Sequence, residues 1–168
     1  LSPAQLIDVN TVNTIVNILS KAKLDPARLE IEITETSMMA NPAVARQIID
    51  DLRGIGIRIS LDDFGTGQSS LGRLREFNFD KVKIDRAFVS TMVEDKPTAH
   101  IVRAILAMCE GLEMRVVADG IEETDQASML SDFGCGGGQG YLYGKAVEGS
   151  VALSQLLQQR DYSSPIAV

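Results

Sequence analysis

The sequence contains no tryptophan, only one histidine and only two cysteines among its 168 residues. Cys109 and Cys135 do not have the spacing of a metal-binding pair, and two cysteines are too few for the disulfide framework of a small secreted domain. We expect Cys109 to be a small buried residue on a helix and the lone His100 to lie on the surface. This cysteine usage favours a reducing compartment, so the predicted location is the cytoplasm.

Long apolar runs and an excess of basic residues are also missing. No apolar run approaches the roughly 20 residues that cross a membrane, and the residues from Leu1 onward do not have the pattern of a signal peptide. The 16 Lys and Arg residues are outnumbered by 23 Asp and Glu residues, which gives a net charge of -7. A general binder of nucleic acid or of an anionic membrane needs a basic face, so we expect no DNA or RNA partner and no direct membrane insertion.

The remaining composition is that of a single globular domain. Hydrophobic residues make up 45% of the chain, and we predict one domain over residues 1–160 followed by a frayed tail at residues 161–168. The apolar periodicity predicts strands that alternate with helices. The expected strands are 29–35, 57–61, 79–85, 114–119 and 139–143, and the expected helices are 11–22, 42–52, 69–75, 95–111, 124–133 and 150–157.

This alternation predicts βα units and a parallel sheet. Acidic residues gather at the ends of the expected strands, which is the layout of a TIM-like (β/α) barrel, where the chemistry lies at the carboxyl ends of the strands. A complete barrel takes about 250 residues, so we expect an incomplete barrel of about five βα units whose first strands are absent. An open, doubly wound sheet of five strands is the alternative, although no phosphate-binding glycine fingerprint follows a first strand to support it.

The segment around Asp62 and Asp63 is the most informative part of the sequence. Apolar residues alternate with short polar ones up to Leu61, then two adjacent carboxylates appear, and then Gly65 and Gly67. Because neighbouring strand residues point to opposite faces, both carboxylates reach one site only if the backbone bends at Asp63. The two glycines would help such a bend. An isolated Asp-Asp pair beside glycines is otherwise typical of an exposed turn.

Five motifs taken together resemble the EAL domains, which are bacterial phosphodiesterases that cut cyclic di-GMP to the linear dinucleotide pGpG on a modified TIM barrel. The resemblance extends from Leu1 to about Val147 and implies that the chain is the C-terminal portion of such a domain, with further sensor or cyclase domains upstream in the parent protein. The motifs are Glu32-Ile33-Thr34-Glu35, Asp62-Asp63-Phe64-Gly65-Thr66-Gly67, Lys83-Ile84-Asp85, Val117-Ala118-Asp119-Gly120-Ile121-Glu122 and Gln139-Gly140-Tyr141.

The resemblance implies a site with two Mg²⁺ or Mn²⁺ ions. Glu32 resembles a metal ligand, Asp62 resembles the ligand that bridges the two ions, and Asp63 resembles a ligand of the second ion. The chemistry agrees with these residue types, because hard divalent cations prefer carboxylate oxygens and two of them can clamp the attacking and leaving oxygens of an in-line displacement.

The resemblance also implies roles for five residues around the metals. Lys83 resembles the cation that holds the attacking water and the phosphate, and Asp119 occupies the position of the general base. Glu35 resembles the residue that steadies the loop after the next strand, while Glu122 and Gln139 resemble residues that support the site. Without the motifs, Lys83 would be interpreted as a solvated strand lysine and Glu122 as a first-turn acid favoured by the helix dipole.

The sequence departs from the family pattern at four points. No Glu-Ala-Leu segment is present, and the metal-binding Asn of the family would fall immediately before Leu1. Gln68 replaces an aromatic residue and Ala146 replaces a proline, while Asp119 stands where the family has Glu. A carboxylate that is shorter by one methylene moves by about 1 Å, and a displacement of that size can cost on the order of 100-fold in rate.

Two functions of different classes follow from these observations. The retained Glu32, Asp62, Asp63 and Lys83 favour a cyclic di-GMP phosphodiesterase, whereas Asp119 favours a catalytically inactive domain that binds cyclic di-GMP as a receptor. We expect the intact parent to be the enzyme and this chain alone to have little or no turnover, because a barrel without its first strands has open edges and an incomplete ligand set. A homodimer in which a second copy completes the barrel is a third possibility.

Overall fold

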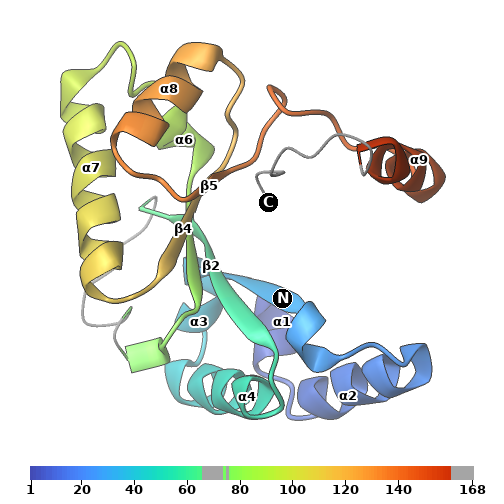
Figure 1. Ribbon diagram of the computed structural model, residues 1–168. Helices are drawn as coiled ribbons and strands as arrows, with labels where there is room; N and C mark the ends of the chain where they lie inside the picture. The colour runs from blue at the N-terminus through green and yellow to red at the C-terminus, as the bar shows by residue number, and fades with distance from the viewer. Residues whose placement is uncertain (66–73, 75, 160–168) are drawn as a thin grey trace.

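The computed structural model describes residues 1–65, 74 and 76–159 (Figure 1). Its centre is a five-stranded sheet in the order β1-β2-β3-β4-β5, in which every neighbouring pair is parallel. The spatial order equals the sequence order, as in a (β/α) barrel, whereas a doubly wound sheet reverses its order at a switch point. The strands are β1 (Glu30–Thr34), β2 (Arg58–Phe64), β3 (Lys81–Ile84), β4 (Arg115–Ala118) and β5 (Gly137–Gly138).

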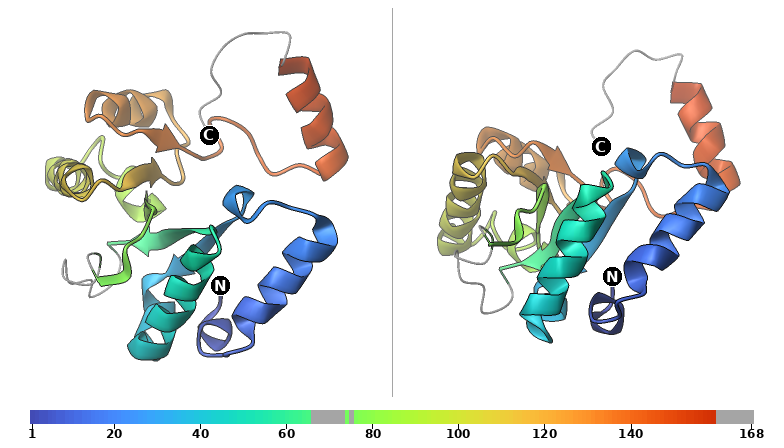
Figure 2. Two further views of the ribbon diagram at one scale, coloured as in Figure 1. Left: turned by 60° about the horizontal axis from the view of Figure 1, so that its bottom comes forward. Right: turned by 90° about the horizontal axis from the view of Figure 1, so that it is seen from below.

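Helices connect the strands and form two groups. Helices α3 and α4 contact β1 and β2, and α7 contacts β4, while α9 lies apart from both groups (Figures 1 and 2). The helices are α1 (Pro3–Leu6), α2 (Thr11–Ala22), α3 (Glu35–Met39), α4 (Pro42–Gly54), α6 (Arg86–Val89), α7 (Lys96–Gly111), α8 (Thr124–Asp132) and α9 (Gly149–Gln159), with a 3₁₀ turn η1 (Pro26–Arg28). Proline and an Asx cap begin the two longest connecting helices: Asn41 accepts from the Val44 N–H and Asp95 from the Thr98 N–H.

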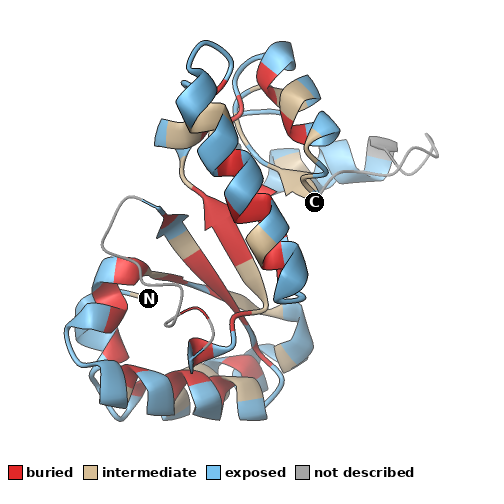
Figure 3. Ribbon diagram, turned by 90° about the vertical axis from the view of Figure 1, so that its left-hand side faces the viewer, coloured by how far each residue is buried: buried red, intermediate tan, exposed pale blue. Residues whose placement is uncertain are grey.

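The hydrophobic core lies between one face of the sheet and the helices. Alternate strand residues such as Ile33, Ile59 and Ile84 are completely buried there, together with Ile49 of α4 and Val102 of α7 (Figure 3). Because the strand period is two residues, the intervening residues point to the opposite face. We call this the charged face, and its residues are Glu30, Glu32, Arg58, Ser60, Asp62, Lys81, Lys83, Arg115, Val117 and, directly after β4, Asp119.

The structure confirms the expected bend at Asp63. This residue has a φ of 55°, and the pairing of β2 with β3 shifts register between Leu61 and Phe64. The strand therefore continues through both carboxylates to Phe64 instead of ending at Leu61. Non-glycine residues rarely adopt this left-handed conformation, and Asp is among those that tolerate it best. The bend changes the direction of the second carboxylate relative to a regular strand.

Most other expected elements agree with the structure, and the helix at 11–22 agrees at both ends. The strand expected at 139–143 is wrong: β5 is formed by Gly137–Gly138, and the chain turns after it. The Gly140 carbonyl accepts hydrogen bonds from the Tyr143 N–H at 3.1 Å and the Gly144 N–H at 3.4 Å, which closes a turn where the strand was expected. The last helix begins at Gly149, one residue before the expected start.

Two expectations concern residues outside the described part of the chain. These are the helical turns at 69–75, of which only residue 74 is described, and the tail at 161–168. Among the described helices, none is long and apolar enough to cross a lipid bilayer.

The buried thiol of Cys109 and the half-buried thiol of Cys135 give a prediction about reactivity. Cys109 is fully buried, and burial, with a smaller contribution from nearby Cys135, raises its pKa to about 11. Burial also raises the pKa of Cys135. Since the thiolate is the nucleophile, we expect both thiols to react with a disulfide reagent at pH 8 at least about tenfold more slowly in the folded chain than in urea. Equal labelling rates in the two states would contradict this.

Candidate functional site

Lys83 is the centre of the site that the structure assembles. Its ammonium Nζ lies 2.9 Å from Asp62 Oδ1, 3.0 Å from Glu32 Oε1 and 3.4 Å from Asp119 Oδ2. The lysine is buried, whereas the three carboxylates remain partly open to solvent. The arrangement brings together four of the residues predicted from the sequence, one from each of β1, β2 and β3 and one from the residue after β4.

The parallel register explains why these four side chains meet. Asp62 lies opposite Thr34 at the carboxyl end of β1, and Asp119 continues β4 by donating its backbone N–H to the Ile84 carbonyl. In the same register Glu32 pairs with Ser60 of β2, and Ser60 in turn pairs with Lys81, two residues before Lys83. Glu32 and Lys83 therefore lie on the same face of the sheet, two strands apart, and their long side chains meet at 3.0 Å.

The electrostatics of the site are those of a cation held by acids. Burial by itself would lower the pKa of Lys83, but its hydrogen bonds and attraction to Asp62 and Glu32 outweigh burial and raise the pKa well above the ordinary lysine value. Lys83 therefore carries a positive charge at neutral pH. Most strand lysines are solvated. The burial of Lys83 therefore supports the functional role that the family motifs imply for it.

Asp63 lies beside this cluster on the bent end of β2. Burial, the negative charges of Asp62 and Asp85, and a hydrogen bond with the Asp85 side chain raise its pKa, while Lys83 lowers it less strongly. Asp85 also caps α6 by accepting from the Ala87 N–H at 2.7 Å. Five carboxylates (Glu32, Asp62, Asp63, Asp85 and Asp119) thus gather around Lys83, so negative charges outnumber the positive charge of this lysine.

The remaining predicted residues surround the cluster at different positions. Glu35 is buried as the first residue of α3, and its Oε2 atom has no hydrogen-bond partner among the described residues. Glu122 is exposed and its Oε1 lies 2.8 Å from Nη2 of Arg86, so its side-chain ion pair is with Arg86. Gln139 is exposed, and its backbone extends the pairing beyond β5 by donating to Ala118 and accepting from Ile121. The loop that Glu35 was expected to steady lies largely outside the described residues.

Sequence reasoning missed Arg86 and the involvement of Asp85 with Asp63. Arg86 follows the Lys83-Ile84-Asp85 motif directly, so its place at the carboxyl end of β3 was available as a signal. Its contact with Glu122 depends on how the loop after β4 folds, which periodicity does not reveal.

The donor set of the site suits divalent cations, although its present geometry is arranged around lysine. Carboxylate oxygens are the ligands that Mg²⁺ and Mn²⁺ prefer, and Glu32, Asp62 and Asp63 supply them at one end of the sheet. Among the described residues, no three His, Cys, Asp or Glu side chains already have a metal-binding arrangement. The acids fit a metal by their chemistry and by their excess of negative charge.

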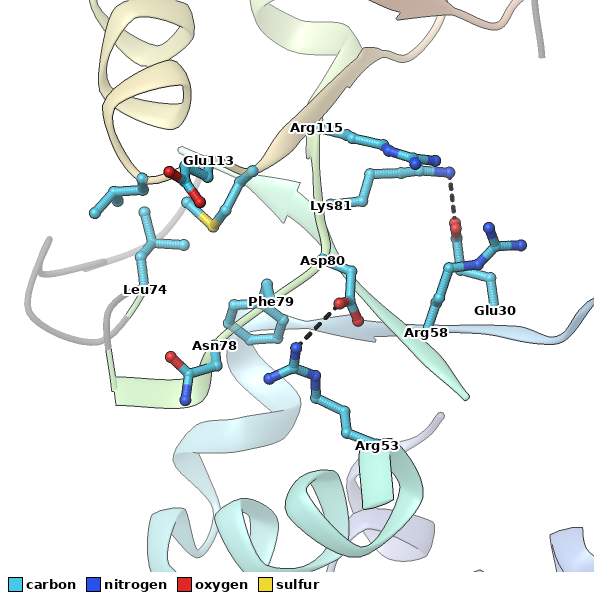
Figure 4. Close-up of a pocket in the computed structure, with 12 residues that line it drawn as sticks. Glu30, Arg53, Arg58, Leu74, Asn78, Phe79, Asp80, Lys81, Glu113 and Arg115 are labelled. Carbon is cyan, nitrogen blue, oxygen red and sulfur yellow. Dashed lines mark hydrogen bonds and ion pairs between the residues drawn. The ribbon is translucent and has the colours of Figure 1, made fainter. Parts of the chain in front are cut away.

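Two cavities lie at the opposite, amino-terminal end of the strands. The first has a volume of about 460 Å³, and its wall includes the starting residues of four strands, with ion pairs between Lys81 and Glu30 (2.7 Å) and between Arg53 and Asp80 (3.1 Å) (Figure 4). The second, of about 830 Å³, shares Arg58 and Arg115 with the first. None of the predicted site residues lines either cavity, and barrels place their chemistry at the other end, so neither is the candidate active site.

Comparison with known sequences identifies the family. The sequence model of the EAL domain matches residues 1–146. An uncharacterized protein of Synechocystis is 42% identical over 143 residues, which are 85% of this chain and 20% of that protein. MucR of Pseudomonas aeruginosa, a bifunctional diguanylate cyclase/cyclic di-GMP phosphodiesterase, is 35% identical over 156 residues, 93% of this chain and 23% of MucR. The chain therefore spans about a fifth of the length of these relatives.

Solved structures show the same fold. The MucR phosphodiesterase in complex with c-di-GMP is similar with a TM-score of 0.86 at 35% identity, and the similarity covers 90% of this chain and 62% of that one. A manganese and cy-diGMP complex of BlrP1 from Klebsiella pneumoniae is similar with a TM-score of 0.81 at 31% identity, over 86% of this chain and 37% of BlrP1. The chain belongs to the EAL domain family, and its sequential parallel sheet is an incomplete TIM-like (β/α) barrel of the EAL type.

Proposed function

We propose that this chain is part of a phosphodiesterase domain that hydrolyses cyclic di-GMP to pGpG by in-line attack of water, assisted by two divalent metal ions. The observation that carries the proposal is the convergence of Lys83 with Glu32, Asp62 and Asp119 at the carboxyl end of the sheet. The name of MucR and the c-di-GMP in its solved complex support the choice of substrate. The proposed domain acts in the cytoplasm, with sensor or cyclase domains elsewhere in the parent protein.

Glu32, Asp62 and Asp63 are the residues that would hold Mg²⁺ or Mn²⁺, with Asp62 between the two ions. When bound, such ions stabilise the charge on the attacking and leaving oxygens of a phosphodiester. The manganese in the BlrP1 complex supports a divalent cation in this family. Five acids crowd one end of the sheet, so without added positive charge they would repel the anionic substrate.

Lys83 and Asp119 would act directly on the reacting atoms. The raised pKa of Lys83 keeps its ammonium protonated, so it can donate hydrogen bonds to a phosphoryl oxygen and to the attacking water. Asp119 is partly exposed next to that ammonium, and its carboxylate can accept the proton of the water. Glu35, Glu122 and Gln139 would support the site through the loops that surround it.

A cyclic di-GMP receptor without turnover is the second candidate. Asp119 favours it, because its carboxylate is one methylene shorter than the Glu of the family and lies 3.4 Å from Lys83, the longest of the three ion pairs. A receptor needs the substrate-binding groups but does not need a well-placed base.

The test is to incubate the chain with cyclic di-GMP and either Mn²⁺ or Mg²⁺, and to separate the nucleotides by chromatography while binding is measured on the same sample. Formation of pGpG that stops on chelation of the metal supports the phosphodiesterase. Binding without pGpG supports the receptor, and the absence of both overturns the two proposals for this chain. Size-exclusion chromatography on the same sample shows whether activity accompanies a homodimer.

The substitution Asp119→Glu distinguishes the two candidates further. We expect it to raise turnover by about tenfold or more, because the added methylene moves the carboxylate by about 1 Å towards the water-binding position. Asp119→Asn, which keeps the length but removes the base, is the matched control and should lower turnover. An unchanged or lower rate in Asp119→Glu would show that this loop already places the shorter acid correctly.

A further inference from the structure

Arg86 crosses the loop that carries Asp119 and touches it at two points. Its guanidinium Nη2 lies 2.8 Å from Glu122 Oε1. Its aliphatic stem covers Gly120, where an added Cβ would lie only 2.4 to 2.9 Å from the Cβ, Cγ and Cδ atoms of the arginine. Gly120 has a φ of 76°, a conformation that glycine adopts readily. One side chain thus packs on the residue after Asp119 and pairs with the far end of the same loop.

The other side of this loop is held by the backbone. Ile121 donates its N–H to the Gln139 carbonyl at 3.0 Å, and the buried Gln126 accepts the Glu122 N–H through Oε1 at 2.8 Å. Gly140 lies directly against the Ile121 backbone. Segment 119–122 therefore contacts both the residues after β5 and Arg86, and among the described residues its side-chain ion pairs are those of Arg86 with Glu122 and of Lys83 with Asp119.

We propose that Arg86 is a positioning residue for the reaction: it presses loop 119–122 into the conformation in which Asp119 faces Lys83. This inference rests on the proposed phosphodiesterase function. An exposed ion pair alone contributes little, because solvent screens it. Here the packing of the stem on Gly120 is added to the pair, so loss of the arginine releases a contact one residue away from the proposed base.

The position of Arg86 in the chain indicates which kinetic constant its loss should change. It is the first residue of α6, directly after Asp85, and Asp85 neighbours the proposed metal ligand Asp63. Arg86 therefore links the segment that follows Lys83 to the loop that carries Asp119. Its removal should misplace the base while the residues that would bind metal and substrate keep their strand positions, so we expect an effect on kcat more than on KM.

The experiment compares Arg86→Ala, Arg86→Lys and Arg46→Ala in the parent protein. Alanine removes both the guanidinium and the stem that packs on Gly120, and lysine restores a long stem and the charge. Arg46→Ala is the matched control, because Arg46 forms an exposed ion pair with Asp50 on α4, remote from the site. Two readouts are needed: amide hydrogen exchange of residues 119–123, and kcat with KM for cyclic di-GMP hydrolysis.

For Arg86→Ala we expect exchange at Ile121 and Glu122 to accelerate about tenfold and kcat to fall about tenfold while KM changes less than about twofold. Arg86→Lys should recover part of both effects, Arg46→Ala should change neither, and Arg86→Ala should cost less in a Glu122→Gln background, where the ion pair is already lost. Unchanged exchange, or a change in KM alone, would overturn the positioning role. If the unmodified parent protein forms no pGpG, the phosphodiesterase proposal fails, while the exchange data still decide whether Arg86 holds the loop.

Discussion

Replacement of Lys83 with methionine in the parent protein is expected to lower cyclic di-GMP turnover by about 100- to 1,000-fold, the usual cost of removing one preorganised donor from a developing charge. Methionine has a similar length and fills the buried channel that the lysine stem occupies. It provides no donor for a phosphoryl oxygen and no charge to offset Glu32, Asp62 and Asp119. Chromatography of pGpG at saturating substrate measures the effect on kcat.

The same substitution should also destabilise the fold. Three partly exposed carboxylates lose their common partner, and the loss of three ion pairs of up to about 1 kcal/mol each should cost about 1–3 kcal/mol of unfolding free energy in total. The matched control is Lys81→Met, because Lys81 lies on the same strand and face and pairs with one acid, Glu30, at 2.7 Å. Its loss should cost about 1 kcal/mol or less and leave turnover intact. Urea unfolding curves measure the unfolding free energy of both variants. Equal losses of turnover in Lys83→Met and Lys81→Met would show that Lys83 has no special role.

The substitution Asp62→Asn is expected to abolish measurable turnover. Asparagine keeps the size of the side chain and an oxygen that can accept from Lys83, which now lies 2.9 Å from Asp62 Oδ1. It removes the negative charge from the position proposed to bridge two metal ions. Since even residues that only orient metal ligands change affinity by about 10- to 100-fold, loss of the bridging ligand should weaken Mn²⁺ binding by at least about 100-fold.

Calorimetric titration with Mn²⁺ alone separates this effect from substrate binding. Asp51→Asn is the control, because Asp51 is exposed on α4 and accepts a hydrogen bond from Gln47 at 2.9 Å, away from the sheet. That variant should bind Mn²⁺ and turn over substrate as the unmodified chain does. Wild-type Mn²⁺ affinity in Asp62→Asn would rule out Asp62 as a bridging ligand, whatever its effect on turnover.

Local patterns were enough to predict most of the architecture. Apolar residues at a spacing of two placed four of the five strands, and the proline and Asx residues at the starts of α4 and α7 marked where these helices begin. The strand at 139–143 failed because the sheet there is formed by Gly137 and Gly138, which have no side-chain pattern to read. Short elements such as α3 and α6 also escaped, since four or five residues show no helical period.

The candidate site could be predicted in part for a similar reason. Parallel strands end at the same edge of a sheet, so acids at strand ends must gather there, and the bend at Asp63 followed from the adjacency of two carboxylates. Glu122 and Gln139 were assigned only by resemblance. The structure gives Glu122 an ion pair with Arg86 and places Gln139 by its backbone, neither of which spacing reveals.

The sequence by itself determined the parallel alternation of strands and helices, the acidic end of the sheet and the family, because each depends on local periodicity or on short motifs. Only the tertiary structure decided that Lys83 is buried among three acids, that Glu32 reaches it from two strands away, and that Arg86 covers Gly120. These contacts join residues that are far apart in the chain. They depend on strand register and on the reach of each side chain, which are set only when the elements pack together.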